Sequence, residues 1–373
     1  MRVLVAPDTF KGTLTAAQAG EAIAAGWRRV RPGDDVSVLP LADGGDGTLD
    51  ALVPREGGPG AARIRRRVTG PLGDPVDAEL GIRDGAGVVE MARASGLTLV
   101  APERRDPRRA TTRGTGELMR AALDAGAREL LVCLGGSATN DGGVGTASAL
   151  GVRFLDAAGR PLPDGGLALL DLASIDARGL DPRLASAPVL ALTDVDAPLT
   201  GPRGASVVFG PQKGAAHDEV LVLDRALGHL AAVVYRDLGV DVASEAGAGA
   251  AGGLGFGLAA FCGARIRPGV EVVMAAVGFV PALEAADLVV TGEGTFDRTS
   301  TRGKVVGGVI EAAALAGVPV AVVCGRADAP APTGAVLRTL VDRMGEEAAL
   351  RDARRAVTLV AGDLAADVEA PVG

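Results

Sequence analysis

The feature that most constrains the fold is an apolar strand that leads into a glycine-rich turn and then into a helix. Leu130–Leu134 are apolar, residues 135–143 read GGSATNDGG, and small helix-forming residues follow to Gly151. Glycines let backbone N–H groups approach a ligand, and the start of a helix favours negative charge. A capped turn needs one polar residue, but this turn carries four: Ser137, Thr139, Asn140 and Asp141. We therefore interpret it as a ligand-facing loop rather than as a plain capped turn.

The same layout recurs along the chain, which predicts an α/β fold. Apolar strands that end in polar or glycine-rich turns are expected at residues 2–6, 36–42, 188–196, 287–290 and 318–325. A helix is expected from Thr15 to about Val30, because Thr15 and Gln18 have capping-box spacing. In open α/β sheets, ligands bind where strands end and helices begin. The side chains just after these strands are therefore the candidate site residues.

These candidates are mainly aspartates, lysines and glycines. They are Asp8 and Lys11 after the first strand, DGGDGT at residues 43–48 after the second, Asp194 and Asp196 at the end of 188–196, and TGEGTFD at residues 291–297 followed by Lys304. Glycines allow close backbone approach, and aspartates suit a metal ion or a substrate hydroxyl. In extended geometry Asp194 and Asp196 would share a face. The alternative is ordinary turn chemistry, with Asp8 as a cap and Asp194 and Asp196 in a turn before Pro198.

Lysine usage is a second unusual feature. Only three of the 38 basic residues are lysines, and each has a glycine neighbour: Lys11, Lys213 and Lys304. Lysine is a compact point charge that suits phosphate, whereas arginine is a wide fork. We expect at least one of the three to bind a phosphate or a carboxylate, the alternative being three ordinary surface lysines.

Composition excludes several functional classes. The net charge of −8, with RIRRR at residues 63–67 as the one basic tract, argues against a nucleic-acid partner. No uncharged apolar run reaches about 18 residues, so no membrane partner is expected. With two histidines and three dispersed cysteines, a histidine-based zinc site, a relay of several histidines and a disulfide framework are improbable, and there is no P-loop motif. We expect a cytoplasmic protein.

A change in the pattern of expected strands, helices and turns along the sequence predicts two domains. Residues 54–62 resemble a linker, short strands and turns begin near residue 63, and the strand–helix pattern of the N-terminus returns from about residue 283. The segment at residues 247–257 contains a literal G-x-G-x-x-G at Gly247, Gly249 and Gly252. No apolar strand precedes it, so we interpret it as a packed or mobile segment near the ligand rather than as a dinucleotide fingerprint.

Taken together, seven segments resemble the bacterial type I glycerate kinases. They are Ala6–Gly12, Ala42–Thr48, Gly135–Gly143, Asp194–Leu199, Phe209–Gly214, Gly247–Gly257 and Thr291–Gly294, in the family's order. Thr295–Phe296 departs from the family pattern, which has a basic and then an aliphatic residue there. The resemblance implies ATP-dependent phosphorylation of D-glycerate, usually on its 2-hydroxyl. It also implies two α/β domains, a flavodoxin-like parallel-sheet domain (1–62 plus 283–373) and a mixed α/β domain inserted into it (63–282), with the active site in the cleft between them.

The resemblance and the residue chemistry lead to a set of expected roles. Asp194 or Asp297 would accept the hydroxyl proton, and Lys11 would assist catalysis. Substrate contacts are expected from Asp8, Lys11, Ser137, Asn140, Asp141 and Lys304. Nucleotide contacts are expected from Gly44, Gly45, Thr48, Gly135, Gly136, Gly292 and Gly294. Asp43, Asp46 and Asp196 would help to hold Mg²⁺.

Three alternatives stay open at this point. GGDGT also occurs in NAD kinases and in diacylglycerol- and phosphofructokinase-like enzymes, so another kinase of that type could act on a different small hydroxylated substrate. A dinucleotide-dependent oxidoreductase would use Gly247–Gly252, and a non-catalytic protein would bind a sugar acid without consuming ATP. The sequence is compatible with a homodimer but does not determine the oligomeric state.

Overall fold

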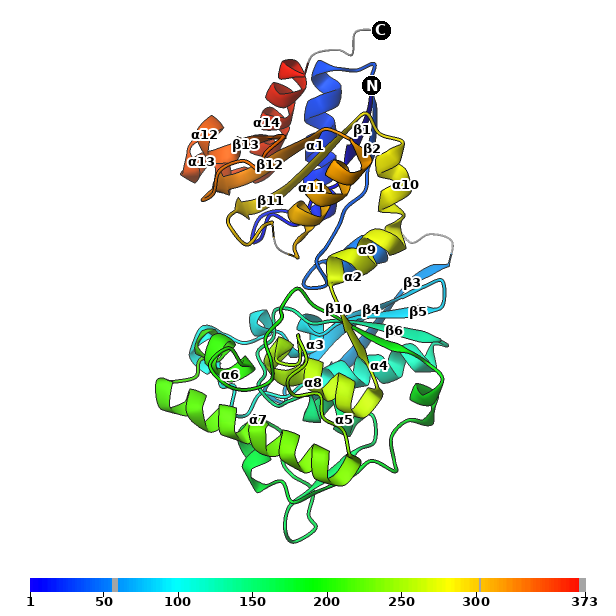
Figure 1. Cartoon of the computed structure of the whole chain (residues 1–373), viewed down its shortest axis with the longest axis vertical. Coiled ribbons are helices and arrows are strands. Elements are labelled where there is room, and N and C mark those ends of the chain that lie inside the picture. Colours follow the sequence, from blue (N-terminus) through cyan, green and yellow to red (C-terminus); the bar gives the residue numbers. More distant parts are fainter. Residues whose placement is uncertain (56–59, 302, 369–373) are drawn as a thin grey trace. The chain divides into compact units, whose positions relative to one another are not determined.

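The computed structural model describes residues 1–55, 60–301 and 303–368. Its internal contacts divide the chain into two compact units (Figure 1). Unit 1 consists of Met1–Asp43, Asp50–Leu52 and Pro268–Gly373, and unit 2 consists of Gly44–Leu49 and Val53–Arg267. Along the sequence, unit 2 therefore interrupts unit 1. The sequence prediction placed the corresponding boundaries at residues 63 and 283.

Unit 1 is built on a five-stranded parallel sheet. Its strands are β1 (Arg2–Val5), β2 (Asp35–Val38), β11 (Leu288–Phe296), β12 (Val320–Ala327) and β13 (Ala335–Thr339). The spatial order is β2-β1-β11-β12-β13, and all four pairings are parallel. Counted within unit 1 alone, this is the order 2-1-3-4-5 of flavodoxin-like folds. The predicted flavodoxin-like sheet is therefore confirmed.

The helices of unit 1 are α1 (Ala16–Val30), α9 (Gly269–Val277), α10 (Phe279–Glu284), α11 (Val305–Ala316), α12 (Leu340–Met344), α13 (Glu346–Arg351) and α14 (Ala353–Asp367). Helices α1, α11, α12 and α14 pack on the parallel sheet, and further helices of unit 1 pack on them. The predicted capping box is present, since the Gln18 amide donates to Thr15 Oγ1 and the Thr15 amide donates to Gln18 Oε1. Helices α1 and α14 lie side by side (Figure 1). They approach closely because Gly26 lacks a Cβ, which would stand 2.1 Å from the Thr358 carbonyl oxygen.

Unit 2 contains a six-stranded mixed sheet, in line with the predicted mixed α/β domain. Its strands are β3 (Ala61–Thr69), β4 (Pro75–Arg83), β5 (Ala86–Glu90), β6 (Glu129–Cys133), β9 (Val189–Leu192) and β10 (Arg265–Arg267). The order is β10-β9-β6-β5-β4-β3, antiparallel from β3 to β5 and parallel from β5 to β10. Within the predicted linker at 54–62, residues 56–59 lie outside the described residues, and β3 begins at Ala61.

The remaining elements complete unit 2 and the connection to it. The helices are α2 (Thr48–Leu52), α3 (Ala92–Ser95), α4 (Arg113–Asp124), α5 (Val144–Ala149), α6 (Ala205–Phe209), α7 (His217–Leu238) and α8 (Ala250–Cys262). A two-stranded sheet pairs β7 (Arg153–Leu155) with β8 (Ser174–Asp176). Single 3₁₀ turns lie at Leu97–Leu99, Pro102–Arg104, Leu167–Asp171, Pro182–Ala185 and Pro211–Lys213. Throughout the described ranges, no helix combines the length and the apolarity needed to cross a membrane.

Candidate functional site

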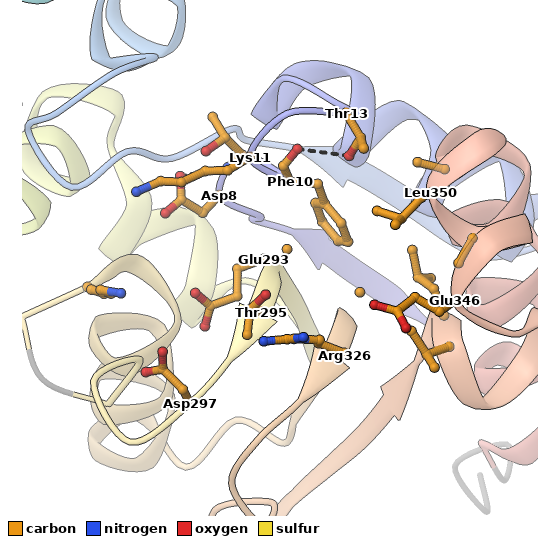
Figure 2. A pocket seen from close by; sticks show the side chains of 18 of the residues that line it. Asp8, Phe10, Lys11, Thr13, Glu293, Thr295, Asp297, Arg326, Glu346 and Leu350 are labelled. Atoms are coloured by element: carbon orange, nitrogen blue, oxygen red, sulfur yellow. Dashed lines mark hydrogen bonds between the residues drawn. The ribbon is translucent and has the colours of Figure 1, made fainter. Parts of the chain in front are cut away.

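A cavity of about 330 Å³ lies in unit 1 where β1, β11 and β12 end. Its lining carries five carboxylates and three cations: Asp8, Asp43, Glu293, Asp297 and Glu346 with Lys11, Lys304 and Arg326. Figure 2 shows Asp8, Lys11 and Glu293 gathered at one end of the cavity. Strands β1 and β11 are neighbours, and in a sheet of this order their carboxyl ends mark the place where ligands bind.

Local backbone pairing brings the polar residues together. The chain continues beside β11 after β1 ends, because the Asp8 amide donates to the Gly292 carbonyl oxygen at 2.8 Å. A Cβ on Gly292 would stand 2.1 Å from the Val323 carbonyl oxygen. A Cβ on Gly294 would stand 3.2 Å from the backbone nitrogen of Lys11. Both glycines therefore permit close strand packing, and Gly294 also lines the cavity. Their expected contacts with a nucleotide stay predictions.

The carboxylates of this cavity crowd one another. Burial, followed by the charge of Asp43, raises the pKa of Asp8 to about 7, against hydrogen bonding from the Thr9 amide and the charge of Lys11. Burial is also the main cause that raises the pKa of Glu293, which is 7% exposed. Its Oε1 atom is buried and has no hydrogen-bond partner in the part of the chain that the structure describes. Such a site would be stabilised by a bound cation or by hydrogen-bond donors from a ligand.

Asp297 has a different environment. Its carboxylate accepts hydrogen bonds of 2.6 Å from the Thr299 amide and from Thr299 Oγ1, and these bonds lower its pKa. Lys304 is the residue just before α11, where its side chain makes no capping hydrogen bond, and it lines the same cavity. Six predicted site residues thus line this cavity of unit 1: Asp8, Lys11, Asp43, Gly294, Asp297 and Lys304.

Sequence reasoning missed Glu293 and Arg326 as site residues. Glu293 lies in TGEGT, which the sequence suggested to be a turn after a strand and which the structure makes part of β11, so the strand-end pattern that selected Asp8 could also have selected it. Arg326 had no such signal. It lies near the end of β12, and only the pairing of β11 with β12 brings it to the cavity.

In unit 2, the two glycine-rich loops pack against each other. A Cβ on Gly135 would stand 2.8 Å from the Gly45 Cα, and one on Gly136, at φ +63°, would stand 2.8 Å from Asp46 Oδ1. Thr48 donates from Oγ1 to the Gly45 carbonyl oxygen at 2.8 Å, which closes the DGGDGT turn. Asp46 is exposed and lines a separate hollow of unit 2. The predicted nucleotide contacts of Gly44 and of these loop residues stay predictions.

The polar side chains of the 135–143 loop are buried within unit 2. Asp141 accepts from the Thr112 amide and Thr112 Oγ1 at 2.8 and 2.9 Å, and from the amides of Gly143 and Gly145. Burial raises its pKa, and these donors oppose that rise. Asn140 donates from Nδ2 to Ser206 Oγ at 2.9 Å.

Part of the loop nevertheless has unused hydrogen-bonding capacity. Asn140 Oδ1 is buried without a partner among the described residues. Ser137 is also buried. In this structure Asp141 shapes the loop, and the expected substrate contacts of Ser137, Asn140 and Asp141 stay predictions.

Lys213 is buried and so is not an ordinary surface lysine, and the expectation that at least one of the three lysines binds a phosphate or a carboxylate stays a prediction. The side chain of Lys213 is 2% exposed, and Nζ donates to the Thr139 carbonyl oxygen at 2.8 Å, so it lies beneath the 135–143 loop. Burial lowers its pKa from 10.5 to about 7, and the charge of Asp141 acts against that change. Lys213 therefore supports the loop from inside unit 2.

The glycine-rich segment at 247–257 packs against the same loop, as expected for a packed segment. Gly252 has φ +70°, and a Cβ there would stand 1.9 Å from the Thr139 carbonyl oxygen. Its own carbonyl accepts from the Gly142 amide at 3.1 Å. The backbone leaves helical geometry from Ala251 to Gly253, within α8. These glycines therefore serve close backbone contact.

The strand-end prediction for Asp194 and Asp196 was wrong in its geometry. Strand β9 ends at Leu192, and Asp194 lies in a bend, so the extended conformation that would place both carboxylates on one face is not present. Both side chains are exposed. Their expected roles as base and magnesium ligand stay predictions. Within the described ranges, no three His, Cys, Asp or Glu side chains are arranged to hold a metal ion.

Comparison with known proteins agrees with this arrangement. The model of the glycerate kinase family matches residues 3–369. The chain is 49% identical over 327 residues to glycerate kinase of Bacillus subtilis (strain 168), covering 87% of this chain and 85% of that protein. It is 45% identical over 315 residues to glycerate 2-kinase of Escherichia coli (strain K12), covering 84% of this chain and 82% of that protein.

A solved structure extends the similarity to the fold. The crystal structure assigned to glycerate kinase 2 of Salmonella typhimurium LT2 matches with a TM-score of 0.86 and 44% identity, covering 98% of this chain and 97% of that chain. The sequence match and the fold match both span nearly the whole chain, including residues 247–252, and both are to glycerate kinases. They therefore argue against the alternative of a dinucleotide-dependent oxidoreductase. The chain therefore belongs to the glycerate kinase family.

Proposed function

We propose that this protein transfers the γ-phosphoryl group of ATP to the 2-hydroxyl of D-glycerate and releases 2-phospho-D-glycerate, as a cytoplasmic step in the breakdown of organic acids. Family membership supports the choice of glycerate. The name of the Escherichia coli relative, glycerate 2-kinase, supports the 2-hydroxyl. The observation that carries the proposal is the cavity of unit 1, where lysines and carboxylates converge at the ends of β1 and β11.

Phosphoryl transfer needs little covalent chemistry from a protein. It requires positioning of the two substrates and stabilisation of the charge that spreads over the phosphoryl oxygens. Lys11 and Lys304 would bind phosphate oxygens or the glycerate carboxylate. A compact ammonium group suits both anions, and both lysines line the cavity.

The carboxylates of the cavity fit a magnesium ion. The charges of Asp43 and Glu293 both act on Asp8, and within the described part of the chain the buried Oε1 atom of Glu293 has no hydrogen-bond partner. Magnesium is commonly bound by one or two carboxylates together with waters and substrate phosphates. Asp8 and Asp43 would hold the ion, which when bound neutralises phosphate charge. The expected contributions of Asp46 and Asp196 are part of the same proposal and can be tested by substitution.

The proton of the attacking hydroxyl would pass to a carboxylate. Asp297 is the candidate in unit 1, and its hydrogen bonds to Thr299 hold the carboxylate in a fixed orientation. Asp194 is the candidate in unit 2. Asp297→Asn and Asp194→Asn should separate them, because the variant that lacks the base should lose kcat with little change in either KM.

The test of the proposed function is turnover of ATP with D-glycerate, followed by phosphorus NMR of the product. The expected result is a phosphomonoester on the 2-hydroxyl. A product phosphorylated on the 3-hydroxyl would contradict the regiospecificity, and a lack of glycerate-dependent ATP turnover would contradict the reaction. A parallel assay with NAD as acceptor tests the kinase alternative, and we expect no phosphate transfer to NAD.

A further inference from the structure

The cavity of unit 1 has an apolar end that the polar chemistry does not use. Phe10, Leu340, Ala349, Leu350 and Ala353 line it. In Figure 2, Phe10 lies between the polar end at Asp8 and Lys11 and the opposite end at Leu350. The same continuous cavity therefore has one end that is mainly charged and one end that is mainly apolar, with Glu346 of α13 as a charged residue at the apolar end.

The apolar end is built by the C-terminal helices. Leu340 lies on α12, Ala349 and Leu350 lie on α13, and Ala353 begins α14. Phe10, Leu340, Ala349 and Ala353 are buried, so they form a fixed wall. Leu350 differs, because 63% of it is exposed, and it therefore offers apolar surface that the chain itself does not cover.

The two proposed substrates differ in what they could place there. Glycerate is a three-carbon hydroxy acid without an apolar face. ATP carries at one end a flat base, whose two faces pack well against apolar side chains and whose edges are polar, and at the other end a charged triphosphate, so its two ends match the two ends of the cavity. Arg326 and Glu346 also line the cavity and supply polar groups for the edges of a base.

We propose that unit 1 binds the nucleotide, with the purine base of ATP against Leu350 and Phe10 and the triphosphate toward Lys11 and Lys304. This inference rests on the proposed function for the identity of the nucleotide. It adds a base-binding wall formed by α12, α13 and α14. No residue of these three helices was among those expected from the sequence to contact ATP.

Leu350→Asn tests the wall with little risk to the fold, because the side chain is mostly exposed and the substitution adds no charge. Leu315→Asn on α11 is the matched control, since Leu315 is 86% exposed and lies outside the cavity lining. Leu350→Met keeps the apolar volume and should behave like the unmodified protein. Circular dichroism and the melting temperature establish that each variant is folded.

Binding is measured by titration calorimetry without glycerate, using ATP and inorganic tripolyphosphate as probes. Leu350→Asn should weaken ATP binding by about tenfold, because the base loses an apolar partner. Binding of tripolyphosphate, which has no base, should stay unchanged. In turnover, KM for ATP should rise while KM for D-glycerate stays the same.

Three results would overturn the inference: unchanged ATP affinity in Leu350→Asn, an equal loss for ATP and tripolyphosphate, or the absence of ATP binding by the unmodified protein. Failure of the proposed function looks different. In that case the unmodified protein binds ATP, and loses that binding in Leu350→Asn, but transfers no phosphate to D-glycerate.

Discussion

Replacing Lys213 with methionine should change the pH dependence of stability in unit 2. Lys213 is 2% exposed, and burial lowers its pKa from 10.5 to about 7. At roughly 1.4 kcal/mol per pH unit, this change corresponds to about 5 kcal/mol of preference for the neutral amine in the folded protein. The charged lysine is therefore costly to bury, even though it donates a hydrogen bond to the Thr139 carbonyl oxygen.

The sign follows from proton binding. Between about pH 7 and pH 10.5 the unfolded chain keeps a proton on Lys213 that the folded chain has released. The free energy of unfolding therefore rises with pH across this window, and the whole cost of the buried charge is present below pH 7. Methionine removes that cost but leaves the Thr139 carbonyl without its donor, at about 1–3 kcal/mol. At pH 6 the variant should be about 2–4 kcal/mol more stable than the unmodified protein.

The assay is urea unfolding at pH 6, 7, 8 and 9. Unfolding of unit 2 is monitored by hydrogen exchange in peptides from α7. These peptides report on unit 2, whereas Trp27, the single tryptophan of the chain, belongs to unit 1. The advantage of Lys213→Met should shrink by about 1.4 kcal/mol for each pH unit above 7. Val208→Met, a neutral change at an exposed site of unit 2, is the control and should show no such slope. A constant difference between pH 6 and pH 9 would refute the reasoning.

Three further substitutions probe the cavity and the loop. Lys11→Ala should lower kcat/KM by about 10²-fold or more, measured by ATP turnover with D-glycerate, and an unchanged kcat/KM would remove Lys11 from the site. Asp141→Asn should cost about 3 kcal/mol of stability in urea unfolding, because an amide nitrogen would face backbone donors, and a neutral outcome would contradict that account. Gly252→Ala should cost about 3 kcal/mol or more, since its Cβ would meet the Thr139 carbonyl oxygen, whereas Gly239→Ala, also at φ +70° but in open space, should cost about 1 kcal/mol. Equal losses in the two glycine variants would show that the contact is unimportant.

Local sequence patterns predicted where helices and strands lie along the chain better than they predicted which strands pair with each other. The capping box at Thr15 and Gln18 is confirmed, because it depends on two residues three positions apart. The flavodoxin-like order depends instead on the pairing of Val3 with Leu288, which are far apart in the chain. No local pattern specifies that pairing, so the order came from the family resemblance.

The difference between local patterns and long-range pairing also explains which residues that line the cavity were predicted from the sequence and which were missed. Asp8 and Asp297 were correctly predicted to lie at the strand ends that line the cavity, because each follows an apolar strand and the ends of parallel strands meet at one edge of a sheet. The sequence did not indicate that Lys213 is buried, because a lysine beside a glycine has the same local pattern whether its ammonium group faces solvent or a buried carbonyl. Burial is a property of the packed unit and is not encoded by adjacent residues.

The apolar end of the cavity shows why a site can escape motif analysis altogether. Leu340, Ala349 and Ala353 are the commonest kinds of core residue, so nothing in their local sequence distinguishes a ligand-facing wall from an ordinary helix interface. What distinguishes them is position, because α12 begins where β13 ends, at the same edge of the sheet as Asp8 and Glu293. A charged phosphate site must use a few specific residue types and therefore leaves a readable motif. A surface for a flat base needs only apolar area in the right place, and many side chains supply that equally well. The two halves of one binding site can therefore differ sharply in how well a sequence predicts them.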